Sequence, residues 1–121
     1  MKLIIAGSRH FDSDTMINTV LSALSLFKLI GVAEVVSGMS GGVDVAGIHY
    51  AKISEKKIST FPADWKLGKS AGPRRNRDMA MYADALLLIW DGESPGSKNM
   101  KSEMERLHKP IYEVVFKAPP Q

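Results

Sequence analysis

The chain has 121 residues, 45% of them hydrophobic, and a formal net charge of +3. This length suits one domain with a single core, and so mild a positive charge does not by itself indicate a nucleic-acid-binding protein. The chain contains no cysteine, which excludes disulfides, thiolate metal sites and cysteine nucleophiles. Its longest strongly apolar run, 85–90, is far shorter than the roughly 18 residues needed to cross a bilayer.

The N-terminus lacks the pattern of a signal peptide. We therefore expect a cytoplasmic protein without a membrane partner. Neither a linker nor an internal repeat interrupts the sequence, so we expect one domain over residues 1–116. Residues 117–121, which include two prolines, are expected to form a flexible C-terminal tail.

Short β-prone segments alternate along the chain with segments of helical periodicity. The predicted strands are 3–6, 34–37, 57–61, 85–90 and 111–116. A helix is predicted between each pair of successive strands, and the third of these is expected to start near Pro73. The residues predicted to face the core from these helices are Ile17, Val20, Leu21, Leu24, Phe27, Val43, Ala46, Tyr50, Ile53, Met79, Ala80, Ala83, Met100, Met104 and Leu107.

This alternation predicts an α/β fold, a Rossmann-like three-layer α/β/α domain with a five-stranded, mainly parallel sheet. Segments 3–6 and 86–89 are continuously apolar, which is typical of strands covered on both faces, so we expect them near the centre of the sheet. Ligands of such sheets bind beyond the carboxyl ends of the strands, where the strand order reverses. The loops that follow the strands are therefore the candidate binding elements.

The loop after the first strand begins with Gly7, Ser8 and Arg9. A glycine, a hydroxyl and a guanidinium are groups that recognise phosphate. The loop matches neither the dinucleotide fingerprint nor the P-loop, so a tight turn with a solvated Arg9 is an equal alternative.

The loop after the second strand holds three glycines, with Ser37 and Gly38 at its start and Gly41, Gly42 and Asp44 at its end. Glycines allow close backbone approach, and the helix that follows would present free N–H groups. We expect an anion cradle here. The alternative is a turn that serves helix packing, with Asp44 complementing the helix N-terminus.

The loop after the third strand combines aromatic, acidic and basic side chains. Trp65 could stack on a base or pack on a neighbouring chain, whereas Arg75 and Asn76 could reach a phosphate or a ribose. Asp64, Lys69 and Arg74 lie in the same stretch, and the alternative interpretation is a solvated basic face.

The loop after the fourth strand contains Asp91, Ser94, Gly96 and Ser97. It is expected to lie beside the first loop and to supply a second phosphate contact. The alternative is that Ser97 or Asn99 simply caps the following helix.

Five segments together are similar to a known family. They are Gly7 to Arg9 with Phe11, 37–44, 62–65, 71–76 with Met79, and 94–97. In this order, over nearly the whole chain, they resemble the YspA-like branch of the SLOG superfamily, and 37–44 also resembles the corresponding loop of the DprA family of DNA-processing proteins. The resemblance implies a Rossmann-like fold that senses or processes nucleotide-derived ligands.

The related LOG phosphoribohydrolases use an Arg-Lys pair and a glutamate. Arg75 matches their arginine, but Asn76 replaces the lysine and Met100 falls where the glutamate is expected. Catalysis, and with it any catalytic residue, is left open. Asp44, Asp64, Asp91 and Glu103 are the carboxylates that could act in its place.

The leading hypothesis is binding of a phosphate-bearing nucleotide or nucleotide-derived ligand. No metal is assigned, since the three histidines lack metal-binding spacing, and no resident cofactor is predicted. The predicted ligand-binding residues are Gly7, Ser8, Arg9, Ser37, Gly38, Gly41, Gly42, Asp44, Asp64, Trp65, Lys69, Arg74, Arg75, Asn76, Asp91, Ser94, Gly96 and Ser97.

Two alternatives remain. One is an N-glycosidic or phosphoester hydrolase that uses the same site. The other is single-stranded nucleic-acid binding through Trp65 and the basic residues between 66 and 77. We also expect a homo-oligomer, because so small an α/β unit encloses only part of a ligand.

Overall fold

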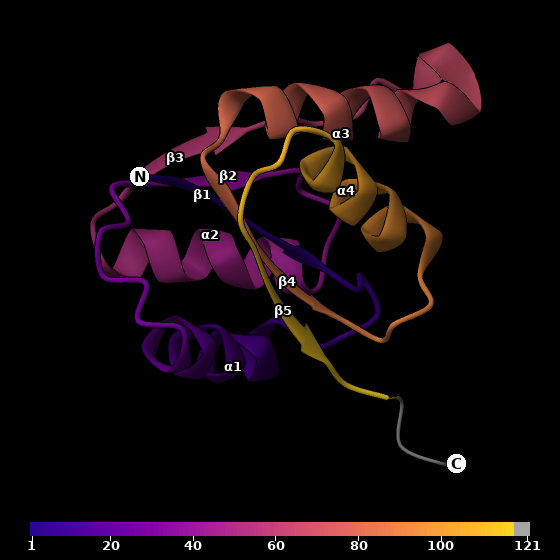
Figure 1. Cartoon of the computed structure of the whole chain (residues 1–121). Coiled ribbons are helices and arrows are strands. Elements are labelled where there is room, and N and C mark those ends of the chain that lie inside the picture. Colours follow the sequence, from indigo (N-terminus) through magenta and orange to yellow (C-terminus); the bar gives the residue numbers. More distant parts are fainter. Residues whose placement is uncertain (118–121) are drawn as a thin grey trace.

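In the computed structural model, which describes residues 1–117, parallel strands form one sheet between two layers of helices (Figure 1). The strands are β1 (Lys2–Gly7), β2 (Glu34–Ser37), β3 (Lys57–Thr60), β4 (Ala85–Trp90) and β5 (Ile111–Val115). The helices are α1 (Ser13–Leu26), α2 (Val43–Ile53), α3 (Ala71–Tyr82) and α4 (Pro95–Arg106), with a 3-10 helix, η1 (Trp65–Ser70), before α3. The predicted three-layer α/β/α fold is confirmed.

The strand order is β3-β2-β1-β4-β5, and every neighbouring pair is parallel. The chain builds the sheet outward from β1 to β3 and then returns to the other side of β1 with β4. The order therefore reverses between β1 and β4, where Gly7 is aligned with Ile89. In an open parallel sheet, this is where a crevice forms at the carboxyl ends of the strands.

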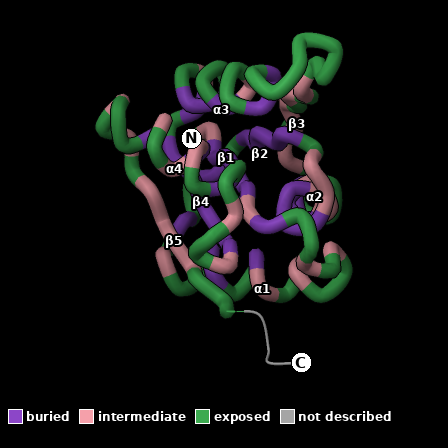
Figure 2. The backbone as a smooth tube through the Cα atoms, turned by 90° about the vertical axis from the view of Figure 1, so that its right-hand side faces the viewer, coloured by how far each residue is buried: buried purple, intermediate pink, exposed green. Residues whose placement is uncertain are grey.

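Successive residues of the central strands enter two separate cores. Leu3 and Ile5 pack towards α1 and α2, whereas Ile4 and Ala6 pack towards α3 and α4. All six residues of β4 and all four of β2 are buried, whereas the edge strands β3 and β5 are partly exposed (Figure 2). The expectation that β1 and β4 lie centrally is confirmed, because both faces of each are covered.

Two residues predicted to face the core do not. Leu21 is 46% exposed and Ile53 is 74% exposed. Val20 and Leu24 already carry the buried stripe of α1, and Leu21 lies about 100° further round the helix than Val20. Ile53 is the last residue of α2, beyond the part of the helix that the sheet covers.

The segment before α3 also differs from the prediction. Residues 65–70, expected to be a loop, form η1, and α3 begins at Ala71, two residues before Pro73. Of the predicted tail 117–121, only Lys117 belongs to the described residues. Within residues 1–117, no helix has the length and apolar character to cross a membrane.

Candidate functional site

A cavity of about 470 Å³ opens at the carboxyl ends of β1 and β4, beside the N-terminus of α4. It lies where the strand order reverses, as expected for a ligand site in this fold. The predicted site residues that line it are Gly7, Ser8, Arg9, Asp44, Arg75, Asn76, Ser94, Gly96 and Ser97. The structure thus brings together residues from all four loops that the sequence indicated.

A smaller cavity of about 290 Å³ adjoins the first. Arg9, Ser40 and Arg75 line both cavities. The smaller one adds the predicted residues Trp65 and Gly38. The two cavities therefore form one region divided by shared side chains.

The N-terminus of α4 carries free backbone donors on residues that line the larger cavity. Pro95, the first helical residue, has no N–H, and the first intrahelical bond runs from the Lys98 N–H to the Ser94 carbonyl at 3.0 Å. The Gly96 and Ser97 N–H groups find no acceptor among residues 1–117. Ser94 is the N-cap residue, but its hydroxyl makes no capping bond. Unpaired N–H groups and the helix dipole favour an anion at such a terminus.

Ser97 strengthens this indication. It lines the larger cavity, only 7% of its surface is exposed, and its hydroxyl has no hydrogen-bond partner in the described part of the chain. Because no fully buried side-chain N or O atom of the described residues lacks a hydrogen-bond partner, this hydroxyl is accessible from the cavity. Ser97 therefore offers a donor that a ligand could use.

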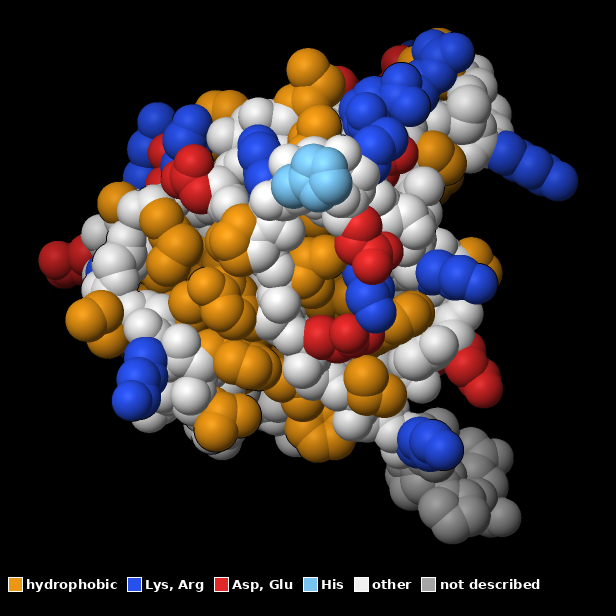
Figure 3. Space-filling view, viewed as in Figure 1, with side chains coloured by type: hydrophobic (Ala, Val, Ile, Leu, Met, Phe, Trp, Pro, Cys, Tyr) orange, Lys and Arg blue, Asp and Glu red, His pale blue; other side chains and the backbone are white. Residues whose placement is uncertain are grey.

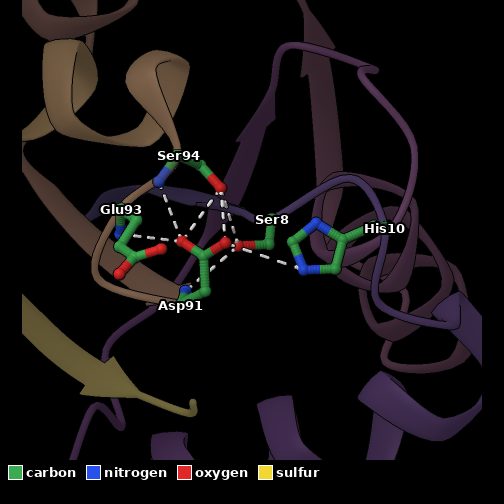
Figure 4. A network of polar contacts seen from close by, with 5 residues as sticks. All are labelled: Ser8, His10, Asp91, Glu93 and Ser94. Atoms are coloured by element: carbon green, nitrogen blue, oxygen red, sulfur yellow. Dashed lines mark hydrogen bonds and ion pairs between the residues drawn. The ribbon is translucent and has the colours of Figure 1, made fainter. Parts of the chain in front are cut away.

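The β4–α4 loop is held by Asp91 (Figure 4). Its Oδ1 accepts bonds from the Glu93 N–H at 2.9 Å, the Ser94 N–H at 2.8 Å and the Ser94 hydroxyl at 2.9 Å. The Glu93 N–H contributes most to lowering the pKa of Asp91 to about 2. The Asp91 N–H in turn donates to Ser8 Oγ at 3.1 Å, which ties this loop to the loop after β1.

The same network does not form a Ser-His-Asp triad. In a triad, the imidazole lies between the hydroxyl and the carboxylate. Here Asp91 lies in the middle: Ser94 Oγ donates to it at 2.9 Å, and His10 Nε2 lies 3.7 Å from its Oδ2 (Figure 4). A carboxylate with so low a pKa is a poor base for the Ser94 hydroxyl. The cluster organises the two loops instead.

Asp44 lies in the first turn of α2 and is 4% exposed. Its Oδ1 accepts a bond from the Gly7 N–H at 3.3 Å, and its Oδ2 accepts one from the Ser40 N–H at 3.2 Å. Burial raises its pKa to about 6, against the opposing effects of the Ser40 bond and the charge of Arg75. Among the described residues, it is the one carboxylate that lines either cavity.

Arg75 is part of the wall between the cavities rather than a free arm. Its Nη1 donates to the carbonyls of Gly38 at 2.6 Å and Phe61 at 3.3 Å, and its Nη2 donates to Ser40 Oγ at 3.3 Å. Burial lowers its pKa. The guanidinium thus joins the loops that follow β2 and β3 and fixes the shape of both cavities.

Asn76 links the two helices above the cavity. Its Nδ2 donates to Asn99 Oδ1 at 2.8 Å and to the Gly96 carbonyl at 3.3 Å, and its Oδ1 accepts a bond from Arg75 Nε at 2.9 Å. It is 5% exposed, so it positions the start of α4 relative to α3.

Gly42 packs closely against the loop after β1. Its φ is +51°, and a Cβ there would lie 2.3 Å from the Ser8 carbonyl oxygen. The absence of a side chain lets the loop after β2 pack against the loop after β1. Gly41 has φ +87° and lines neither cavity.

Several other predicted residues also lie outside both cavities. Ser37 is buried and donates to the Asp44 carbonyl, Asp64 caps η1 by accepting a bond from the Lys66 N–H, and Asp91 holds its own loop. Lys69 and Arg74 are exposed. In the space-filling view, Lys and Arg side chains gather at the upper right, over η1 and the start of α3 (Figure 3).

Sequence reasoning missed several cavity residues. Ser40 lies within the glycine-rich loop and could have been included for its hydroxyl, and His10 directly follows Arg9. Met39 lines the smaller cavity, and Met79 and Met100 line the larger one. A methionine at helical spacing carries no sequence signal that separates a cavity wall from a core position.

No group of three or more His, Asp or Glu side chains within residues 1–117 is arranged to hold a metal ion. No protein-family model and no curated protein matches the chain.

Proposed function

We propose that this protein binds a phosphate-bearing nucleotide or nucleotide-derived ligand, with a phosphate in the larger cavity against the N-terminus of α4. One observation carries the proposal: the Ser97 hydroxyl, on a residue that is 7% exposed, and the N–H groups of Gly96 and Ser97 have no partner within residues 1–117 and lie at the same cavity. A phosphate oxygen accepts such bonds. The role agrees with what the resemblance to YspA-like proteins implies.

Arg9 supplies the charge that a phosphate needs. Its side chain makes no hydrogen bond or ion pair with any other described residue, and it lines both cavities. It is therefore available to a ligand, whereas Arg75 is held by main-chain carbonyls.

A thermal-shift screen tests the proposal with mononucleotides, cyclic nucleotides, NAD and ADP-ribose. A ligand at 100 times its Kd stabilises the native state by about 2.7 kcal/mol. We expect Arg9→Gln to weaken binding of the best ligand by about tenfold or more, because a charge-assisted hydrogen bond contributes about 1.5–3 kcal/mol.

Lys52→Gln is the matched control, since Lys52 is exposed on α2, lines neither cavity and carries the same charge. Its variant should bind within about twofold of the parent. No stabilisation by any compound in the screen would refute the proposal.

A second candidate is hydrolysis of the N-glycosidic bond of a bound nucleotide. Asp44 favours it, because this carboxylate lies at the larger cavity with its pKa raised to about 6, close to the pH at which a general base acts. Release of free base from nucleoside monophosphates, followed by chromatography, tests this candidate. Activity in the parent that Asp44→Asn abolishes would support it, and no release by the parent would exclude it.

A further inference from the structure

We propose that the smaller cavity holds a nucleobase stacked on Trp65, so that base and phosphate occupy the two cavities on either side of Arg75. This rests on the proposed function, and it narrows the ligand class from phosphate-bearing compounds in general to nucleotides that carry a flat aromatic ring.

Trp65 is exposed but positioned. It is 60% exposed, and its six-membered ring lies over Gly72, where a Cβ would be 3.4 Å from the ring atom Cη2. The turn that carries it is fixed, because the Asp64 side chain accepts a bond from the Lys66 N–H at 3.2 Å and the Asp64 carbonyl accepts one from the Leu67 N–H at 2.9 Å. The indole is therefore held against α3 with most of its area uncovered.

One wall of the smaller cavity is apolar, and the rest of its lining is polar. Met39, Pro62 and Ala63 line it with Trp65. Met39 is 52% exposed and has φ +59°, a conformation that residues other than glycine adopt infrequently. Strained backbone of this kind gathers at ligand clamps. An exposed indole, a strained methionine and a proline together form a platform that suits a flat ring.

The two cavities lie side by side and share three lining residues. Arg9, Ser40 and Arg75 line both, and Arg75 is fixed between them by its bonds to the Gly38 and Phe61 carbonyls. Sites for small molecules usually measure about 300–1,000 Å³. The smaller cavity, at about 290 Å³, lies at the lower edge of this range and suits one part of a ligand rather than a whole nucleotide.

The charged groups that line the smaller cavity are consistent with a nucleobase in this cavity. Two guanidinium groups, of Arg9 and Arg75, line the smaller cavity, and no carboxylate from the described residues does. A cationic ring would be repelled, whereas the electron-rich face of a neutral base is accommodated between arginines and an indole.

The test is calorimetric titration of the full chain with AMP, GMP, CMP, UMP and ribose 5-phosphate. We expect Trp65→Ala to weaken the binding of the tightest-binding nucleotide by about tenfold or more, in line with base–aromatic stacking at other sites. Ribose 5-phosphate affinity should stay within about twofold, and Trp65→Phe should recover most of the loss. Leu67→Ala is the matched control, because Leu67 lies on η1, is 54% exposed and lines neither cavity.

Fluorescence gives an independent readout. Trp90 is 5% exposed and donates to Glu113 at 2.7 Å, so Trp65 is the tryptophan that a ligand in the smaller cavity can reach. Saturable quenching by a nucleotide, absent from Trp65→Phe, supports stacking.

The outcomes separate the two proposals. If a nucleotide binds, but Trp65→Ala does not weaken its binding and it does not quench the fluorescence, the position of the base is overturned. The proposed function then still stands. If no nucleotide and no ribose 5-phosphate binds, the proposed function fails and this inference fails with it. If only an oligonucleotide binds, with affinity that falls steeply with salt, the occupant is a nucleic-acid strand and the inference is overturned.

Discussion

The guanidinium of Arg75 lies directly against Gly38. Its Nη1 donates to the Gly38 carbonyl at 2.6 Å, and a Cβ on Gly38 would stand 2.6 Å from that same nitrogen. The glycine is therefore needed for the arginine to reach the main chain. Two residues 37 positions apart thus fix the wall between the cavities.

Arg75→Ala should lower the free energy of unfolding by about 2 kcal/mol, because it leaves the Gly38 and Phe61 carbonyls without their charged donor. Urea denaturation measures this loss. Arg75→Lys should recover less than half of it, since an ammonium cannot reproduce the planar fork. A fully stable Arg75→Ala variant would show that these bonds contribute nothing to the fold.

Asp44 should make stability depend on pH. The pKa of this carboxyl rises from its ordinary value of 3.8 to about 6 in the folded chain, so the native state binds the proton more tightly than the unfolded state. Its contribution is therefore fully present below about pH 4 and is lost as the pH rises through 6. The size of the effect is about 3 kcal/mol.

The measurement is the difference in unfolding free energy between parent and Asp44→Asn from pH 4 to pH 7. Other carboxyls cancel in this difference. This difference, parent minus Asp44→Asn, should fall by a few kcal/mol as the pH rises. A flat difference would show that Asp44 ionises normally in the folded chain.

Asp91→Ala should loosen the β4–α4 loop and lower both the melting temperature and the affinity for the phosphate ligand. Its Oδ1 holds the Glu93 and Ser94 N–H groups, and these set the start of α4. Asp91→Asn is the matched control, because an amide oxygen can accept the same two bonds. Equal loss in both variants would indicate that the charge of Asp91, rather than its loop contacts, is what matters.

Gly42→Ala should destabilise the chain by about 3 kcal/mol or more. The added Cβ meets the Ser8 carbonyl at 2.3 Å, and φ +51° is unfavourable for alanine. Gly41→Ala shares only the positive φ, since its nearest atom is 3.8 Å away, and should cost about 1 kcal/mol. Denaturation midpoints compare the two, and equal effects would mean that backbone strain alone decides.

The sequence was sufficient to predict the layers, the strands and the loops that meet at the site, because apolar runs and glycine-rich turns are local signals. It was not sufficient for the roles of single side chains. Nothing in the spacing indicates that Arg75 bonds to the Gly38 carbonyl, or that Gly42 makes room for Ser8. Such pairings depend on loops that the fold brings together.

Trp65 shows the same limit. Its exposure of 60% agrees with either a surface for base stacking or a contact between subunits. The local sequence does not distinguish these two roles. Self-association therefore stays a prediction, which light scattering with and without ligand can test.

The contacts of Ser8 with Asp91 and Ser94 join positions 83 and 86 residues apart. During synthesis, the first loop emerges long before these partners, so the larger cavity of a growing chain is not complete until α4 has left the ribosome. The smaller cavity, lined by residues between 9 and 75, needs no part of α4. A phosphate at the N-terminus of α4 therefore cannot template the early steps of folding. Phosphate binding should consequently appear, in a chain lengthened residue by residue, only once α4 is included.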